Sequence, residues 1–400
     1  MGYDVVRIAS SPWRPYVFKT TKFSLQNIPF KDCNQPANSS LLTVSQDSLF
    51  DYLLSSDQLP LTMEAQVEPA EIPLNEFCII KQTQGKGYGV FATRNIPQGT
   101  RILADPPMLK LPGAVMEHAK LTKADIEALA ATISTKLKAL SKEQQREFFS
   151  LANTQRAQFG VFLGIAATNA MLIDFETTEY GIFPKVSRFN HGCRPNSMRS
   201  YHPVLDQAVV HVVKDVSEGE EITVSYVEPG LAFYLRQEQL KEKFGFICGC
   251  NLCLMPENER RLSDMRLTTI MLLFNSIRDD SVILDQPLAS LHNTHTAMLL
   301  QKEEGILEVL AATFYYDAVM ITMAHGDHAR TRVFAEMAKE AAIASYGVDH
   351  PITMGTQALA DDPVGFGIQV KSTMWKHSVD EIPVELDDEA FNSWLWKLEE

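Results

Sequence analysis

Residues 244–253 read FGFICGCNLC and place three cysteines within six positions of a chain that has only six cysteines in all. Such clustering is typical of a metal site, because cysteine is otherwise rare here. Tetrahedral Zn²⁺ needs a fourth ligand, for which the candidates are Cys33, Cys78, Cys193 or a histidine. Cys193 is favoured because it lies in the turn-forming stretch HGCRPN, whereas Cys78 lies in an apolar strand. The pattern predicts a structural zinc site, with buried or reactive free thiols as the alternative; its ligands would be Cys193, Cys248, Cys250 and Cys253.

The chain has 400 residues, of which 45% are hydrophobic and 22% charged, enough for about two or three domains with their own cores. Its net charge of −14 lies mainly in residues 256–400, which carry 11 basic and 24 acidic side chains, whereas residues 81–255 carry 20 and 17. This balance argues against a general basic surface for nucleic acid, so no direct nucleic-acid partner is expected. If the acidic C-terminal part flanks the site where substrate binds, it would attract a protein partner with a Lys/Arg-rich segment.

Two further features of the sequence bear on the cellular location of the protein. The start, MGYDVVRIASSPWRP, lacks the basic and then apolar layout of a signal peptide, and no stretch has the ~18 uninterrupted apolar residues of a membrane span. We therefore expect no membrane partner, and a cytoplasmic and/or nuclear location. The oligomeric state does not follow from the sequence.

From Phe77 the sequence changes to short β-rich runs broken by Gly and Pro. The runs FCIIKQ, GKGYGVFATRNI and TRILADPPMLKL are typical of strands joined by tight turns, and QAVVHVV and EEITVSY continue this pattern further on. Between the two groups, at about 114–170, the periodicity is helical, with capping boxes that begin at Thr122 and Ser141. Strand-rich halves around a helical insert predict an α+β fold.

The chain is predicted to be helical after Cys253. Residues 301–325 and 327–346 have the pattern of a helix hairpin, and a short helix is expected near the C-terminus, behind Asp387. The chain then divides into four parts: an N-terminal extension of unclear order (1–70), a β-rich domain with the helical insert (71–230), a cysteine loop (231–255) and a TPR-like α-helical C-terminal domain (256–400).

Four motifs in this order resemble those of the SET-domain protein methyltransferases, and fit the SET-and-MYND branch and its fungal relatives best. They are GKGYGVFA at 85–92, SRFNHGCRPN at 187–196, GEEITVSY at 219–226 and FGFICGCNLC at 244–253. Each motif is weak alone, but their order and spacing are specific. The resemblance covers residues 77–255 well and the helical tail loosely. It implies a SET domain, a post-SET zinc loop, and S-adenosylmethionine-dependent methyl transfer to lysine side chains of a protein, histone or otherwise.

The resemblance also implies a set of cofactor-binding residues. In the loop 86–89, small residues let backbone groups approach the methionine part of the cofactor. Asn190 and His191 match paired contacts to its adenine and amino-acid ends, Asn169 matches a further contact at the end of the helical insert, and Phe246 matches an aromatic that covers the adenine. The full implied set is Lys86, Gly87, Tyr88, Gly89, Asn169, Asn190, His191, Tyr226 and Phe246.

Tyr226 is the residue that the resemblance places at the catalytic position, where the cofactor meets a narrow lysine channel. Methyl transfer from a sulfonium needs a neutral amine in line with the S–CH₃ bond, and free lysine has a pKa of about 10.4. A site that excludes water lowers that pKa, and so does the positive sulfonium. Catalysis is then mainly positioning, with Tyr226 orienting the amine and the methyl group.

The sequence departs from its relatives at three points. The usual NHSC reads NHGC, so Gly192 replaces a residue with a hydroxyl. Phe244 stands where relatives often have a second channel tyrosine, which bears on substrate choice, methylation number and activity. No cysteine lies between Cys78 and Cys193, so the MYND zinc finger is missing at this point. Two alternatives stay open: a catalytically silent SET scaffold that binds partners, and a methyltransferase that acts on a small molecule.

Overall fold

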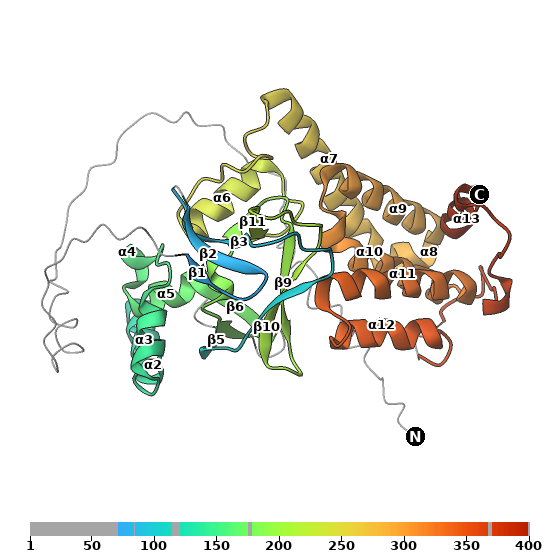
Figure 1. Cartoon of the computed structure of the whole chain (residues 1–400). Helices are drawn as coiled ribbons and strands as arrows, with labels where there is room; N and C mark the ends of the chain where they lie inside the picture. Colours follow the sequence, from blue (N-terminus) through green and yellow to red (C-terminus); the bar gives the residue numbers. More distant parts are fainter. Residues whose placement is uncertain (1–70, 84, 114–120, 175–177, 367–369, 399–400) are drawn as a thin grey trace, which may run out of the picture. The chain divides into compact units, whose positions relative to one another are not determined.

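The computed structural model describes residues 71–83, 85–113, 121–174, 178–366 and 370–398. Residues 71–400 form one compact unit, in which a β-rich part is followed along the chain by helices (Figure 1). The predicted N-terminal extension 1–70, with Cys33, lies outside the described residues. The predicted α+β fold is confirmed.

The β-rich part contains three sheets (Figure 1). The first has five strands in the order β1 (Ile72–Pro73), β2 (Cys78–Thr83), β3 (Gly87–Ala92), β11 (Glu221–Val224) and β8 (Asn190–His191). The second joins β4 (Arg101–Asp105), β10 (Gln207–Val212) and β9 (Ser197–His202). The third joins β5 (Leu109–Pro112), β7 (Glu179–Ile182) and β6 (Ala170–Asp174). The runs quoted from the sequence supply β2 to β5, β10 and β11.

One strand pairing brings two distant motifs together. β8 and β11 run parallel, with Asn190 opposite Thr223 and His191 opposite Val224. The segment that carries the Asn-His pair therefore lies beside the strand that leads to Tyr226. Fully buried side chains beneath these strands include Val90, Phe189 and Ile222.

The helical insert contains α2 (Lys123–Lys138), α3 (Lys142–Phe149), α4 (Arg156–Phe159) and α5 (Phe162–Asn169). Both predicted capping boxes are present: the Thr122 and Ser141 hydroxyls accept the N–H groups of the residues three positions on, whose side chains accept from the cap backbone. The apolar sides of these helices bury Ile133, Phe148 and Leu163 together with residues of β5 and β7. The insert is thereby fixed to the third sheet.

Helices make up the rest of the unit: α6 (Phe233–Phe244), α7 (Glu257–Ile277), α8 (Asp280–Asp285), α9 (Pro287–Glu304), α10 (Leu307–Ala324), α11 (His328–Tyr346), α12 (Pro351–Asp361) and α13 (Asp388–Trp396). The predicted hairpin is confirmed as α10 and α11, but its first helix begins at Leu307 and not at Gln301, which belongs to α9. Gly305 ends α9 in the left-handed region with φ +65°, and a new helix begins at Leu307. Glycine adopts this backbone without a steric cost and so stops a helix whose flanking residues would continue it.

α10 is apolar enough, by length and composition alone, to cross a membrane. Here it packs against both α9 and α11. Phe314, Val319 and Ile321 on this helix are fully buried within the protein. These contacts are those of the core helix of a helical domain.

A group of buried histidines lies where the second sheet meets the C-terminal helices. His211 on β10 accepts a hydrogen bond from Arg101 Nε at 3.2 Å, and Arg101 also pairs with Asp349. His350 caps α12 through Nδ1 and donates from Nε2 to the Tyr201 carbonyl oxygen at 3.1 Å. Burial lowers the pKa of both His211 and His350 to about 4, so both rings are neutral at neutral pH.

We expect these two histidines to make the unit less stable in acid. A histidine whose pKa falls from about 6.5 when unfolded to about 4 when folded loses its stabilising effect as the pH drops from about 6.5 towards 4, and loses no more below that. Between pH 7 and 5 the pair should lower the free energy of urea unfolding by on the order of 2–4 kcal/mol. His350→Asn keeps a cap acceptor and should remove part of this fall. The same pH dependence in wild type and variant would contradict the expectation.

Candidate active site and metal centre

The four cysteines of the predicted cluster come together from two segments. Cys193 follows β8, while Cys248, Cys250 and Cys253 lie between α6 and α7, and all four sulfur atoms lie within 4.8 Å of one another. Cys193 Sγ is 3.8 Å from Cys248 Sγ and 3.6 Å from Cys253 Sγ. Tetrahedral zinc with bonds of about 2.3 Å holds its sulfur ligands about 3.8 Å apart, so the donor set fits zinc. Cys78, fully buried on β2, is not part of the cluster.

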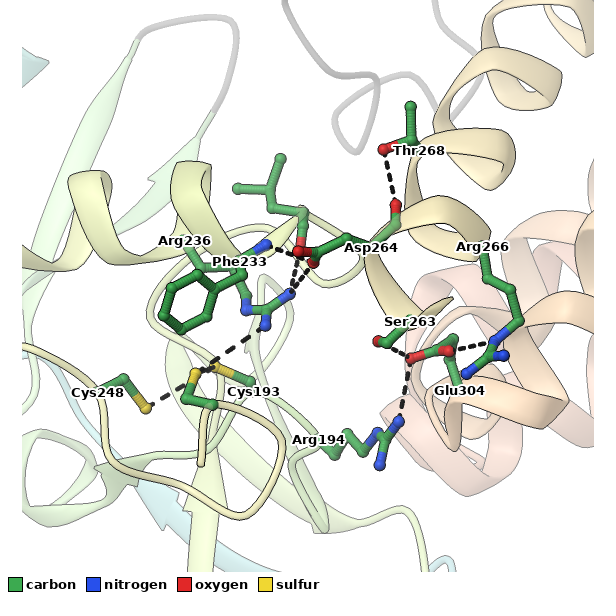
Figure 2. A network of polar contacts seen from close by, with 12 residues as sticks. Cys193, Arg194, Phe233, Arg236, Cys248, Ser263, Asp264, Arg266, Thr268 and Glu304 are labelled. Atoms are coloured by element: carbon green, nitrogen blue, oxygen red, sulfur yellow. Dashed lines mark hydrogen bonds and ion pairs between the residues drawn. The ribbon is translucent and has the colours of Figure 1, made fainter. Parts of the chain in front are cut away.

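Two buried nitrogen donors face this cluster. His191 Nε2 lies 3.2 Å from Cys193 Sγ, and its Nδ1 accepts the Tyr226 backbone N–H at 3.0 Å, so the ring carries its proton on Nε2 and donates it to sulfur. Arg236 of α6, 2% exposed, directs Nη2 at Cys253 Sγ over 4.0 Å (Figure 2). Such donors stabilise thiolates, which are the form of cysteine that binds a metal.

The segment that holds Cys193 is also fixed to the C-terminal helices. Arg194, next to Cys193, pairs at 3.0 Å with Glu304, which lies buried at the end of α9 (Figure 2). Ser263 and Arg266 of α7 donate to the same carboxylate. Burial alone would raise the pKa of Glu304, but the hydrogen bonds from these three side chains lower it, so the carboxylate stays ionised. Through this network the segment that holds Cys193 is tied to α7 and α9.

Tyr226 lies just after β11, within a group of aromatic side chains. Its hydroxyl donates to the Phe189 carbonyl oxygen at 2.6 Å, and its ring centroid is 4.8 Å from that of Phe244 and 5.5 Å from that of His191. The Phe246 ring stands edge-on to it at 6.4 Å. Burial raises the pKa of Tyr226 to about 12, so the phenol stays protonated at neutral pH. Its oxygen therefore donates to the backbone and still has lone pairs to offer a ligand.

Sequence reasoning missed the residue that holds Phe244 and Phe246 in place. α6 ends at Phe244, and Gly245 follows with φ +72°. Gln155, which is 8% exposed, donates from Nε2 to the carbonyl oxygens of Glu242 and Lys243 at 2.8 and 2.7 Å, in the last turn of α6. No local pattern around Gln155 signals this contact, because its partners lie almost ninety positions further along.

Glu221 is a second residue that the sequence did not single out, although the GEEITVSY motif contains it. Its carboxylate accepts from Asn190 Nδ2 at 2.8 Å and from Lys86 Nζ at 3.0 Å. Gly89 lies against this pair: a Cβ there would be 2.8 Å from both the Asn190 amide nitrogen and the Glu221 carboxylate. Only glycine lets β3 approach so closely. Lys86, Gly89 and Asn190, all predicted to bind the cofactor, thus gather around Glu221.

The remaining predicted cofactor residues are less tightly grouped. Asn169, at the end of α5, donates from Nδ2 to the carbonyl oxygens of Ala152 and Ile165 at 2.7 and 2.8 Å, which leaves its amide oxygen for a ligand. Among the described residues, its side chain makes no hydrogen bond to Asn190 or Tyr226. Gly87 has φ +74°, and Tyr88 is 45% exposed at the edge of β3.

Close packing explains why position 192, in the NHGC motif, is a glycine. A Cβ on Gly192 would lie 2.7 Å from Thr223 Oγ1, on the neighbouring strand β11. We expect Gly192→Ser, which restores the residue usual in relatives, to lower the free energy of urea unfolding by about 1–3 kcal/mol through overpacking. The double variant Gly192→Ser/Thr223→Ala should recover most of this loss. A serine variant as stable as the wild type would show that the site accommodates the side chain.

Comparison with known proteins agrees with this geometry. The SET domain family model matches residues 87–227, which include β3, β8, β11 and Tyr226. Histone-lysine N-methyltransferase set5 of Schizosaccharomyces pombe is 31% identical over 322 residues, which cover 79% of this chain and 93% of that protein. The chicken N-lysine methyltransferase SMYD2 is 31% identical over 108 residues, which cover 26% of this chain and 24% of the chicken protein.

Solved structures give weaker matches. The SET domain of LSMT, bound to lysine and AdoHcy, is 12% identical with a TM-score of 0.28, and the match covers 82% of this chain and 89% of that one. Because this TM-score is low, the family assignment rests on the sequence comparisons and not on the solved structures. The match to the Schizosaccharomyces pombe protein spans most of both chains, and the family model includes the segment around Tyr226. The chain belongs to the SET-domain family of S-adenosylmethionine-dependent protein-lysine methyltransferases.

Proposed function

We propose that the aromatic group around Tyr226 is the place of methyl transfer and that histones are among the protein substrates. The observation that carries the proposal is the Tyr226 hydroxyl, which donates to the Phe189 carbonyl directly before the Asn190-His191 pair. The same residues contact Phe244, Phe246 and the cysteine cluster. The name of the Schizosaccharomyces pombe relative supports a histone substrate.

In this mechanism the chain positions the reactants. The cofactor supplies an electrophilic methyl group on a sulfonium. Gly89, Asn190 and the backbone of loop 86–89 bind the cofactor, and Phe246 covers its base. The Tyr226 oxygen, whose proton is engaged by the Phe189 carbonyl, accepts an N–H of the substrate amine and orients its lone pair. The Phe244 ring has no hydroxyl, so it packs against the alkyl chain of the substrate lysine and does not bind its amine.

We further propose that the four cysteines hold one structural zinc ion in a post-SET loop (231–255). The sulfur distances and the donors from His191 and Arg236 support it. Phe246 lies two residues before Cys248, so a closed metal site keeps this aromatic against Tyr226.

The domain division and the substrate class complete the proposal. Residues 71–230 form the SET domain and residues 256–400 the helical domain, whose excess of acidic side chains attracts Lys/Arg-rich segments. High salt should then weaken peptide binding. A histone substrate implies work in the nucleus, whereas a non-histone substrate is compatible with the cytoplasm or the nucleus.

The experiment incubates the purified protein with S-adenosylmethionine labelled on the methyl group and with a cell lysate. The lysate is then separated into protein and small-molecule fractions. We expect the label in protein, with core histones among the labelled chains. Label found only in the small molecules would indicate a methyltransferase that acts on a small molecule. Cofactor binding without any methyl transfer would indicate a catalytically silent scaffold that binds partners.

A further inference from the structure

Arg199 lies over the ring of Tyr226, beside the aromatic group. Arg199 lies on β9, with its guanidinium carbon 5.6 Å from the centroid of the Tyr226 ring. Both side chains keep some exposure to solvent, yet protein surrounds them so closely that burial lowers the pKa of Arg199 and raises that of Tyr226.

The charge of Arg199 has no counter-ion. No carboxylate among the described residues lies within ion-pair distance of its guanidinium, and it donates no hydrogen bond to them; its contact is the Tyr226 ring. A cation held largely out of water without a counter-ion is costly, and such groups are characteristic of functional sites. Glu221 is the carboxylate whose negative charge acts on Tyr226, and it already accepts hydrogen bonds from Lys86 and Asn190.

Other charged groups act on Tyr226 or His191 from the neighbouring elements. They are Glu221 on β11, Lys86 before β3, Arg236 on α6 and Cys250 in the cysteine loop. Lys86 pairs with Glu221, while Arg236 faces Cys253 and Asp264, so both of these cations have partners. Among these cations, Arg199 is therefore the one whose charge is left to act on a ligand bound at Tyr226.

We propose that Arg199 is a specificity-determining residue of the methyl transfer: it admits the target lysine as the neutral amine and disfavours the ammonium form. The proposal rests on the proposed role of Tyr226. A fixed positive charge lowers the pKa of a neighbouring amine because it repels the protonated state. The amine is the nucleophile, so this field increases the reactive fraction of bound substrate at neutral pH.

The charge balance of the step agrees with this role. The target ammonium first loses its proton to the solvent. The lone pair of the neutral nitrogen then bonds to the methyl carbon, the C–S bond breaks, and its electron pair returns to sulfur, which becomes a neutral thioether. The positive charge appears on the methylated nitrogen. The product is again a cation beside Arg199, so the same repulsion favours its departure.

The test measures single-turnover methyl transfer between about pH 6 and 10 by the wild type, Arg199→Met and Arg199→Lys. Recombinant core histones and total lysate protein serve as acceptors. In the wild type the rate should rise with pH to a plateau as the bound amine loses its proton. Arg199→Met should move the midpoint of this rise upward by about one pH unit and recover rate at high pH. Arg199→Lys keeps the charge and should keep the midpoint.

Thermal unfolding and S-adenosylhomocysteine binding verify that each variant is folded, and Arg199→Gln provides a second neutral variant. Coincident midpoints in the wild type and the neutral variants, with a rate lowered equally at every pH, would show a purely structural role and overturn the inference alone. Absence of transfer by the wild type to either acceptor would overturn the proposed function, and the inference with it.

Discussion

Tyr226→Phe is expected to lower kcat by about 100-fold or more while leaving S-adenosylmethionine affinity and the unfolding temperature close to wild type. The variant removes one oxygen, which donates to the Phe189 carbonyl at 2.6 Å and whose lone pairs would orient the amine. The ring and its packing against Phe244 at 4.8 Å remain. Calorimetric cofactor titration and labelled methyl transfer measure the two effects separately.

Tyr234→Phe is the matched control, because Tyr234 is 70% exposed on α6, away from the aromatic group. It should retain wild-type activity. A Tyr226→Phe variant that is as active as Tyr234→Phe would remove Tyr226 from the mechanism. A variant that loses cofactor affinity in proportion to its activity would assign Tyr226 to cofactor binding and not to the transfer.

Cys253→Ser is expected to abolish zinc binding and to unfold the segment around the cluster. Structural zinc supplies about 10 kcal/mol or more in small sites, which is comparable to the whole net stability of a domain. Cys253 Sγ lies 3.6 Å from Cys193 Sγ, so its loss opens the site between the two segments. Elemental analysis should find about one zinc per wild-type chain and almost none in the variant, with a clearly lower unfolding temperature.

Cys33→Ser is the control for this variant, since Cys33 has no proposed ligand role and lies outside the described residues. The Cys33→Ser variant should still bind zinc as the wild type does. Treatment of the wild type with a strong chelator should reproduce the Cys253→Ser behaviour, including weaker cofactor binding through Phe246. A wild-type protein that is folded, active and free of metal after chelation would refute the structural zinc.

The parts of the fold that could be predicted from the sequence are those with a local signal. Strand alternation, the capping boxes at Thr122 and Ser141 and the clustering of cysteines each lie within a few residues, so propensity and spacing are enough. The first helix of the hairpin begins six residues later than predicted because one glycine, Gly305, ends α9 within a run whose flanking residues favour helix.

The parts of the candidate site that could not be predicted depend on contacts between distant segments. Gln155 holds the end of α6, and Arg236 faces Cys253 sulfur, yet neither residue has a distinctive neighbourhood in the sequence. Glu221 lay inside a quoted motif, but its partners Lys86 and Asn190 come from two other strands or their edges. Such roles follow only once the parallel pairing of β8 and β11 is known.

The most direct test of the whole account identifies the atom that receives the methyl group. Core histones and lysate proteins are incubated with S-adenosylmethionine and either the wild type or Tyr226→Phe, and the digests are read by tandem mass spectrometry. The account predicts a gain of whole methyl groups on lysine side chains, present with the wild type and absent or strongly reduced with the variant. Methylation confined to other residue types, or equal methylation by the variant, would contradict it.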